Sequence, residues 1–202
     1  MSPLTSALIT LAAVALWGVL HSILASPRTK RWVHRRIGSS ADRGYRLSYN
    51  VVAVLTLLPV LAVPARNPGL TLYQIPSPLV LITTAVQMLA ILVIVFAVLK
   101  TGAANFLGIR QLFDPEGSDA ARLQVTGFYR WIRHPLYTAA LIFIWLSPVM
   151  TTSTMALYLG FTLYILIGSR FEERQLSAEY GQPYLDYRQT VPALIPQPWR
   201  QN

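Results

Sequence analysis

The amino-acid sequence predicts an all-α integral membrane protein with about five transmembrane helices, an external N-terminus and a cytoplasmic helical tail. Two observations support this fold class. Hydrophobic residues make up 53% of the 202 positions and charged residues only 12%, against roughly 25% charged in soluble domains. The 17 Lys and Arg residues also gather between long uncharged stretches. We expect a single membrane domain over 1–202, with three helices in 1–100 and a cofactor-binding loop, helical hairpin and tail in 101–202.

Four uncharged stretches define the predicted helices, because about 20 apolar residues cross the hydrocarbon core. The first three stretches each predict one helix, and these lie at about 4–25, 48–63 and 79–99. The fourth, 134–169, is too long for one crossing and contains turn and cap signals from Ser147 to Ser153. It therefore predicts a hairpin of two short helices, at about 136–149 and 154–171.

The positions of the charges predict the orientation. With five crossings, the first and third connections and the tail share one side, which then holds 16 of the 17 bases and all eight acids. Bases favour the cytoplasmic side, so the active site should face the cytoplasm. The charge of the first helix follows its apolar stretch, which favours an anchor over a signal peptide. Residues 26–37 predict a basic helix at the membrane surface. The net charge of +9 is thus expected to meet membrane lipids rather than nucleic acid.

The stretch Arg130–Tyr137 (RWIRHPLY) is the most informative one for chemistry. Pro135 suits the first position of a helix, where its missing N–H costs nothing. Arg133 and His134 together with that helix N-terminus form a candidate anion site, and Tyr137 lies one turn further. The alternative is a positively charged helix end with a chance histidine.

Glu172 and Glu173 are expected to end the second helix of the hairpin. Negative charge there costs about 0.3–1 kcal/mol, so a partner should offset it. Arg170 and Arg174 could pair with the acids locally. The hairpin could instead return the acids to the membrane face that holds Arg133, and the two charges would then suit a ligand with a carboxylate and hydroxyls or an ammonium.

Aromatic and histidine side chains supply two further candidates. Tyr180, Tyr184 and Tyr187 could line an aromatic pocket or form an ordinary interfacial belt. His21 lies within the first predicted helix, toward its cytoplasmic end, and polar groups there usually face the bundle interior. It is either a structural histidine or part of a substrate pocket. The absence of cysteine excludes disulfides and thiolate sites, and we expect no metal.

The order of residues in the last 80 positions resembles the isoprenylcysteine carboxyl methyltransferase and phospholipid methyltransferase superfamily. The N-terminal half is more similar to bacterial branches of it, including methanethiol S-methyltransferases and NnrU-like membrane proteins. The motif departs from many members at Ala139, where glycine is common. The matching residues are Gly127, Tyr129, Arg133, His134, Pro135, Tyr137, Glu172, Glu173, Leu176, Tyr180, Gly181, Tyr184, Tyr187, Val191, Pro192, Ile195 and Pro196.

The resemblance implies S-adenosylmethionine as cofactor and methyl transfer to a small or lipophilic acceptor, with a thiol or a carboxylate favoured. It also implies a bacterial inner membrane. Arg133, Glu173 and His21 would act in catalysis. The cofactor would be bound by Gly127, Arg133, His134, Pro135, Tyr137, Glu172, Glu173 and Tyr184.

Two other functions stay open at this point. One is an NADPH-dependent membrane reductase of the sterol-reductase type, which shares a similar arginine–histidine and tail pattern but is longer. The other is a non-enzymatic, NnrU-like accessory protein, because a retained fold does not prove activity. The acceptor could be a free thiol, a lipid, a prenylated protein or a small hydrophobe.

Overall fold

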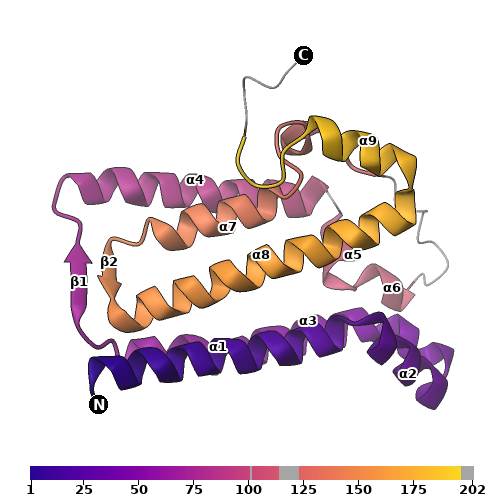
Figure 1. Ribbon diagram of the computed structural model, residues 1–202. Helices are drawn as coiled ribbons and strands as arrows, with labels where there is room; N and C mark the ends of the chain where they lie inside the picture. Colours follow the sequence, from indigo (N-terminus) through magenta and orange to yellow (C-terminus); the bar gives the residue numbers. More distant parts are fainter. Residues whose placement is uncertain (101, 114–122, 197–202) are drawn as a thin grey trace. The chain divides into compact units, whose positions relative to one another are not determined.

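The computed structural model describes residues 1–100, 102–113 and 123–196 (Figure 1). Five charged residues used above to predict orientation lie outside these ranges: Asp114, Glu116, Asp119, Arg122 and Arg200. Helices dominate the described chain. The elements are α1 (Pro3–Ala25), α2 (Pro27–Ile37), α3 (Ser39–Arg66), β1 (Thr71–Gln74), α4 (Leu79–Lys100), α5 (Ala103–Leu107), α6 (Arg110–Phe113), the 3₁₀ helix η1 (Gly127–Arg130), α7 (Pro135–Trp145), β2 (Val149–Thr151), α8 (Thr152–Tyr180) and α9 (Gln182–Thr190).

Four of the described helices, α1, α3, α4 and α8, are long and apolar enough to cross a membrane. Most of their apolar side chains are exposed, and only 6% of the most apolar window of α4 is buried. Such surfaces suit lipid and not water. The fifth predicted crossing, α7, is equally apolar but only 11 residues long. The predicted all-α membrane protein is therefore confirmed, whereas the sidedness of its termini stays a prediction.

Three predicted helix boundaries are wrong. The second helix, α3, begins nine residues before the predicted 48 and continues through Pro59 and Pro64. The helix α7 ends at Trp145 and not near 149, because a strand follows it. The last long helix does not end at Glu172 and Glu173 but continues to Tyr180. The expected cost of these acids at a helix C-terminus therefore does not arise.

The signals that start and stop the smaller helices act as expected. Ser26 caps α2, since its hydroxyl oxygen accepts a hydrogen bond from the Thr29 amide at 3.2 Å. The basic helix predicted at residues 26–37 is thus confirmed as α2. Gly181 takes φ +60° between α8 and α9, a value that favours glycine.

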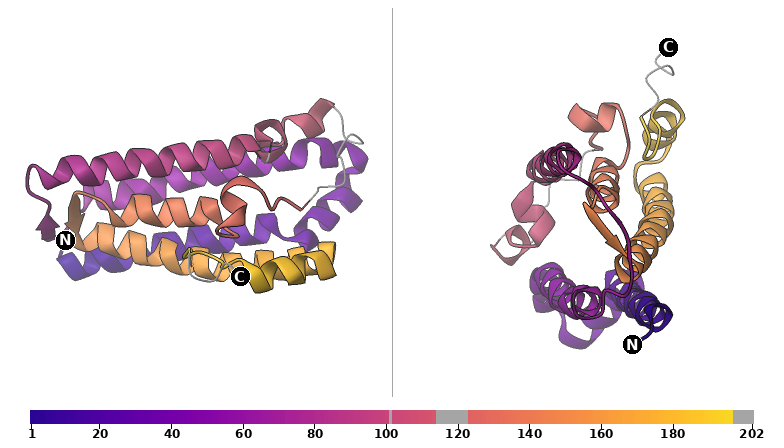
Figure 2. Two further views of the ribbon diagram at one scale, coloured as in Figure 1. Left: turned by 90° about the horizontal axis from the view of Figure 1, so that it is seen from above. Right: turned by 90° about the vertical axis from the view of Figure 1, so that its left-hand side faces the viewer.

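The described chain divides into two compact units, and α8 runs from one into the other at Phe161–Thr162. Unit 1 comprises Met1–Gln74, the described part of Gly102–Ala120, and Val149–Phe161. Within it α1 lies along α3, as Figures 1 and 2 show. Its small core is formed by Val14, Val60 and Leu157, with Trp17 packed against them.

A short antiparallel strand pair, β1 with β2, was not predicted from the sequence. Thr71 pairs with Thr151, and Gln74 with Val149, with an irregularity at Tyr73. The Ser153 hydroxyl also donates to the Asn67 carbonyl at 2.6 Å. These bonds tie the end of α3 to the start of α8 within unit 1.

Unit 2 comprises Ile75–Thr101, Ala121–Pro148 and Thr162–Asn202, of which 101, 121–122 and 197–202 are not described. Within it α4 packs along α7 (Figure 1). Two side-chain hydrogen bonds connect α7 to α4 and to α8. Gln87 donates to the Phe143 carbonyl at 2.8 Å, and the Trp145 indole donates to the Thr162 hydroxyl at 2.9 Å.

Candidate functional site

The start of α7 is held by the segment that follows α9. The amides of Arg133 and His134 donate to the carbonyls of Pro192 and Ala193 at 2.9 and 3.0 Å. The Thr138 hydroxyl donates to the Leu194 carbonyl at 2.7 Å. Pro135 takes the first helical position, as predicted, and is fully buried. Part of the predicted anion site is thus already occupied by the protein's own backbone.

The Arg133 guanidinium is committed to internal partners. Its Nε donates to Oε1 of Glu173 at 2.9 Å, and Nη2 donates to the same oxygen. Its Nη1 donates to the carbonyl oxygens of Arg188, at 3.0 Å, and of Val191. Only 8% of the Arg133 side chain and 14% of the Glu173 side chain are exposed. Of the five N–H groups of an arginine, four are therefore used, and Arg133 fastens α8 to the segment after α9.

His134 and Tyr137 extend this polar cluster to both glutamates. Nε2 of His134 lies 3.2 Å from Oε1 of Glu173, and Nδ1 lies 3.6 Å from Oε2 of Glu172. The Tyr137 hydroxyl donates to Oε2 of Glu172 at 2.8 Å. The two rings stack with their centroids 5.3 Å apart. Glu172 remains 42% exposed, so it is the carboxylate of the cluster that a ligand can reach.

A cavity of about 180 Å³ opens beside this cluster. Its wall combines the charged groups with four tyrosines and two leucines. The lining residues are Leu123, Gln124, Tyr129, Arg133, Glu172, Leu176, Tyr180, Tyr184 and Tyr187.

Of the four tyrosines that line this polar cavity, Tyr184 is fully buried and the other three are half-buried. Tyr184 is 1% exposed, and its hydroxyl has no hydrogen-bond partner among the described residues. The Tyr187 hydroxyl donates to the Tyr129 carbonyl. Burial raises the pKa of all three phenols, and the neighbouring carboxylates of Glu173 and Glu172 raise the pKa of Tyr184 and Tyr129 further. The three hydroxyls are therefore neutral hydrogen-bonding groups at physiological pH.

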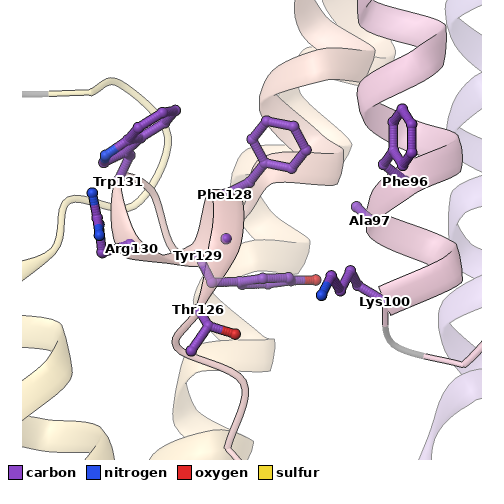
Figure 3. A pocket seen from close by; sticks show the side chains of 9 residues that line it. Phe96, Ala97, Lys100, Thr126, Phe128, Tyr129, Arg130 and Trp131 are labelled. Atoms are coloured by element: carbon purple, nitrogen blue, oxygen red, sulfur yellow. The ribbon is translucent and has the colours of Figure 1, made fainter.

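A larger cavity of about 520 Å³ also has Tyr129 in its wall (Figure 3). We call it the apolar chamber. Tyr129 extends from η1 toward α4 and the Lys100 side chain, while Arg130 and Trp131 stand on the side of η1 away from α4 (Figure 3). Gly127, with φ +65°, permits the turn into η1. The chamber is lined by Phe96, Ala97, Lys100, Thr126, Gly127, Phe128, Tyr129, Arg130 and Trp131.

His21 belongs to unit 1 and is not among the residues that unit 2 brings together. Its Nε2 lies 2.6 Å from the Tyr49 hydroxyl, and its ring lies 4.8 Å from that of Trp17. The predicted position of His21 within the first helix is confirmed. Its role in catalysis remains a proposal.

Most of the predicted polar residues meet in unit 2. Arg133, His134, Tyr137, Glu172 and Glu173 contact one another directly, and Tyr184 shares the polar cavity with Arg133 and Glu172. Gly127 lines the apolar chamber instead. Sequence reasoning missed Phe96, Lys100 and Phe128 as cavity residues. An apolar helix gives no signal that distinguishes a lining residue from a lipid-facing one.

Comparisons with known proteins agree with this arrangement. The family model described as "NnrU protein" matches residues 9–194. Methanethiol S-methyltransferase of Crocosphaera subtropica is 25% identical over 96% of this chain and 76% of its own length. Methanethiol S-methyltransferase 2 of Bradyrhizobium diazoefficiens is 30% identical over 94% and 73%. Protein-S-isoprenylcysteine O-methyltransferase of Mus musculus is 30% identical over only 50% and 35%. No solved structure matches at a significant level.

Proposed function

The chain belongs to the NnrU family and is a membrane methyltransferase, and we propose that it transfers the methyl group of S-adenosylmethionine to a thiol. One observation carries the proposal beyond family membership. The hairpin of α7 and α8 brings the Arg133–His134 pair and the Glu172–Glu173 pair into one cluster beside a cavity walled by tyrosines.

The groups around the polar cavity fit this methyl donor chemically. S-adenosylmethionine carries an ammonium, a carboxylate, ribose hydroxyls and a sulfonium. The exposed part of Glu172 can accept from hydroxyls or the ammonium, and the remaining Arg133 N–H can donate to the carboxylate. The buried Tyr184 hydroxyl has a bond to give. The volume of about 180 Å³ is below the roughly 300–1,000 Å³ of whole ligand sites, so this cavity suits the amino-acid end of the donor.

Tyrosine rings of the same wall suit the positive charge of a sulfonium. Aromatic faces attract ligand cations, by about 0.5–2 kcal/mol depending on desolvation. Tyr129, Tyr184 and Tyr187 are kept neutral by their raised pKa values, so they offer rings and hydroxyls without adding charge. In this proposal His134 is a positioning residue for Glu173. Arg133 holds Glu173 and the segment after α9 in place, and its remaining N–H contacts the donor.

When bound, S-adenosylmethionine supplies an electrophilic methyl group attached to a positively charged sulfur. Glu172, Arg133 and Tyr184 would hold the donor, and the bound donor would supply its methyl group to the deprotonated acceptor sulfur, so that the sulfonium and thiolate charges would cancel. A site that excludes water favours this step, since the reactants are more strongly solvated than the transition state. The proton passes to a base, for which His21 and His134 are the two candidates.

We favour a thiol over a carboxylate as the acceptor because the two groups of relatives match different shares of the chain. The relatives named for an S-methyl transfer match 94–96% of the chain, whereas the relative named for an O-methyl transfer matches half of it. We place the protein in a bacterial inner membrane with the polar cavity open to the cytoplasm, as the distribution of bases predicts.

The test uses the purified full chain in lipid nanodiscs. We expect S-adenosylmethionine to bind in calorimetry and labelled methyl to pass to a thiol. Glu172→Gln should raise the dissociation constant of the donor at least tenfold. The matched control Glu179→Gln, on the same helix but outside the cavity, should change it less than twofold. Binding of NADPH in place of S-adenosylmethionine would favour a reductase, and donor binding without transfer to any acceptor would favour an accessory role.

A further inference from the structure

The lining of the apolar chamber does not match the polar groups of the methyl donor. Its lining includes Phe96, Ala97, Phe128 and Trp131. Ala97 is 1% exposed and lies in α4. Desolvating an adenine or a ribose against such walls would leave their polar atoms without partners. A hydrocarbon group suits them.

Two features connect the chamber to the reaction. Tyr129 lines both the chamber and the polar cavity, so the two spaces share one side chain as a wall. Lys100 points toward the Tyr129 ring (Figure 3) and has no acidic partner among the described residues. An ammonium at this edge stabilises a thiolate, because a nearby positive charge lowers the pKa of a thiol.

The size of the chamber exceeds that of a very small acceptor. A water molecule occupies about 30 Å³ of liquid, so about 520 Å³ has room for an acceptor with many heavy atoms. Methanethiol has two.

Resting on the function proposed above, we propose that the apolar chamber holds the acceptor and that the acceptor is a thiol with a hydrocarbon group of several carbons. The sulfur lies at the Tyr129–Lys100 edge and the hydrocarbon group lies between Phe96 and Phe128. Lys100 is then a specificity residue for the anionic sulfur, and the aromatic rings select chain length.

The test measures kcat/KM for methane-, butane-, hexane- and octanethiol with the full chain in nanodiscs. Each buried methylene should raise kcat/KM about two- to fourfold until the chamber is full. Partition of long thiols into the lipid raises their local concentration for every variant alike. The decisive quantity is therefore the ratio of kcat/KM for hexanethiol to that for methanethiol, compared between variants.

A matched pair of substitutions isolates the chamber. Ala97→Leu fills it and should lower this ratio at least tenfold. Ala90→Leu makes the same change at a buried alanine of the same helix, outside the chamber, and should leave the ratio within twofold. The ratio cancels any loss of folded protein. Phe96→Ala, at an exposed position, enlarges the chamber and should move the optimum to a longer chain.

The outcomes separate the two proposals. Methyl transfer to thiols with equal ratios in wild type, Ala97→Leu and Ala90→Leu would overturn the chamber assignment and leave the function standing. Loss of S-adenosylmethionine binding in Ala97→Leu alone would assign the chamber to the donor and overturn the assignment as well. Failure to bind S-adenosylmethionine and to methylate any thiol would remove the function itself.

Discussion

Arg133 and Glu173, 40 residues apart in the chain, form a buried ion pair with an Nε–Oε1 distance of 2.9 Å. The pair joins Arg133, two residues before α7, to Glu173 in the last third of α8. Through the carbonyls of Arg188 and Val191 the same guanidinium also holds the end of α9. The Arg133 guanidinium thus connects the hairpin to the tail, next to the polar cavity.

Removal of either partner should destabilise the protein. Arg133→Ala or Glu173→Ala leaves the other charge buried, which costs about 3–5 kcal/mol in comparable pairs. The double substitution should cost clearly less than the sum of the two, because neither uncompensated charge remains. Thermal unfolding in nanodiscs measures all three. Additive losses would contradict a direct coupling of the two side chains.

The pH dependence of the reaction tests His21 as the base. In wild type, kcat/KM with a thiol should rise with pH through a limb that reports deprotonation of the base. His21→Asn should remove that limb and lower kcat at least tenfold. Tyr49→Phe, which removes the hydrogen bond to His21, should shift the limb without abolishing it. A limb unchanged in His21→Asn would exclude this histidine as the base.

Alkaline titration should separate the buried tyrosines from the others. Tyr129, Tyr184 and Tyr187 have pKa values raised above the ordinary value near 10. Their contribution to stability is complete below about pH 10 and is lost as the pH rises above it, because the unfolded state then releases protons that the folded state retains. Absorbance at 295 nm should show late ionisation, with one late phenol fewer in Tyr184→Phe. Ionisation of every tyrosine near pH 10 in the folded protein would refute this.

Gly108 should not tolerate a side chain. It takes φ +86° after α5, and a Cβ there would lie 2.5 Å from the Leu47 amide nitrogen and 2.8 Å from the Arg46 carbonyl carbon. Backbone atoms of α3 cannot move aside cheaply, so Gly108→Ala should cost about 2 kcal/mol or more. The control Gly44→Ala has open space in α3 and should be neutral or stabilising. Equal unfolding temperatures for the two variants would disprove the close approach.

The sequence predicted the long membrane helices, and it predicted the meeting of Arg133 with the acids at 172–173 only as one of two alternatives. Uncharged stretches report directly on membrane crossings. The turn signals from Ser147 to Ser153 predicted a hairpin, which could return its two polar ends to one side of the membrane. Motif order in the last 80 residues then pointed to the residues of the polar cluster.

Other parts of the structure depend on interactions that a sequence pattern does not show. The segment 172–180 is rich in good helix formers, so α8 continues to Tyr180. The two acids find their partners in Arg133, His134 and Tyr137 and not at a helix end. The carbonyls of Val191 and Pro192 that hold Arg133 are backbone groups, which carry no residue-specific signal. The strands β1 and β2 are too short to have a period.

The length of α8 also bears on how deep the polar cluster would lie in a membrane. Its 29 residues span about 44 Å at 1.5 Å per residue, whereas about 20 residues cover a hydrocarbon layer of about 30 Å. Counted from Thr152, that layer ends near Phe171, and Glu172 is the first residue beyond it. Lipids with longer acyl chains would bring both carboxylates closer to the hydrocarbon core. Hydrophobic mismatch would then lower the hydration of the polar cluster.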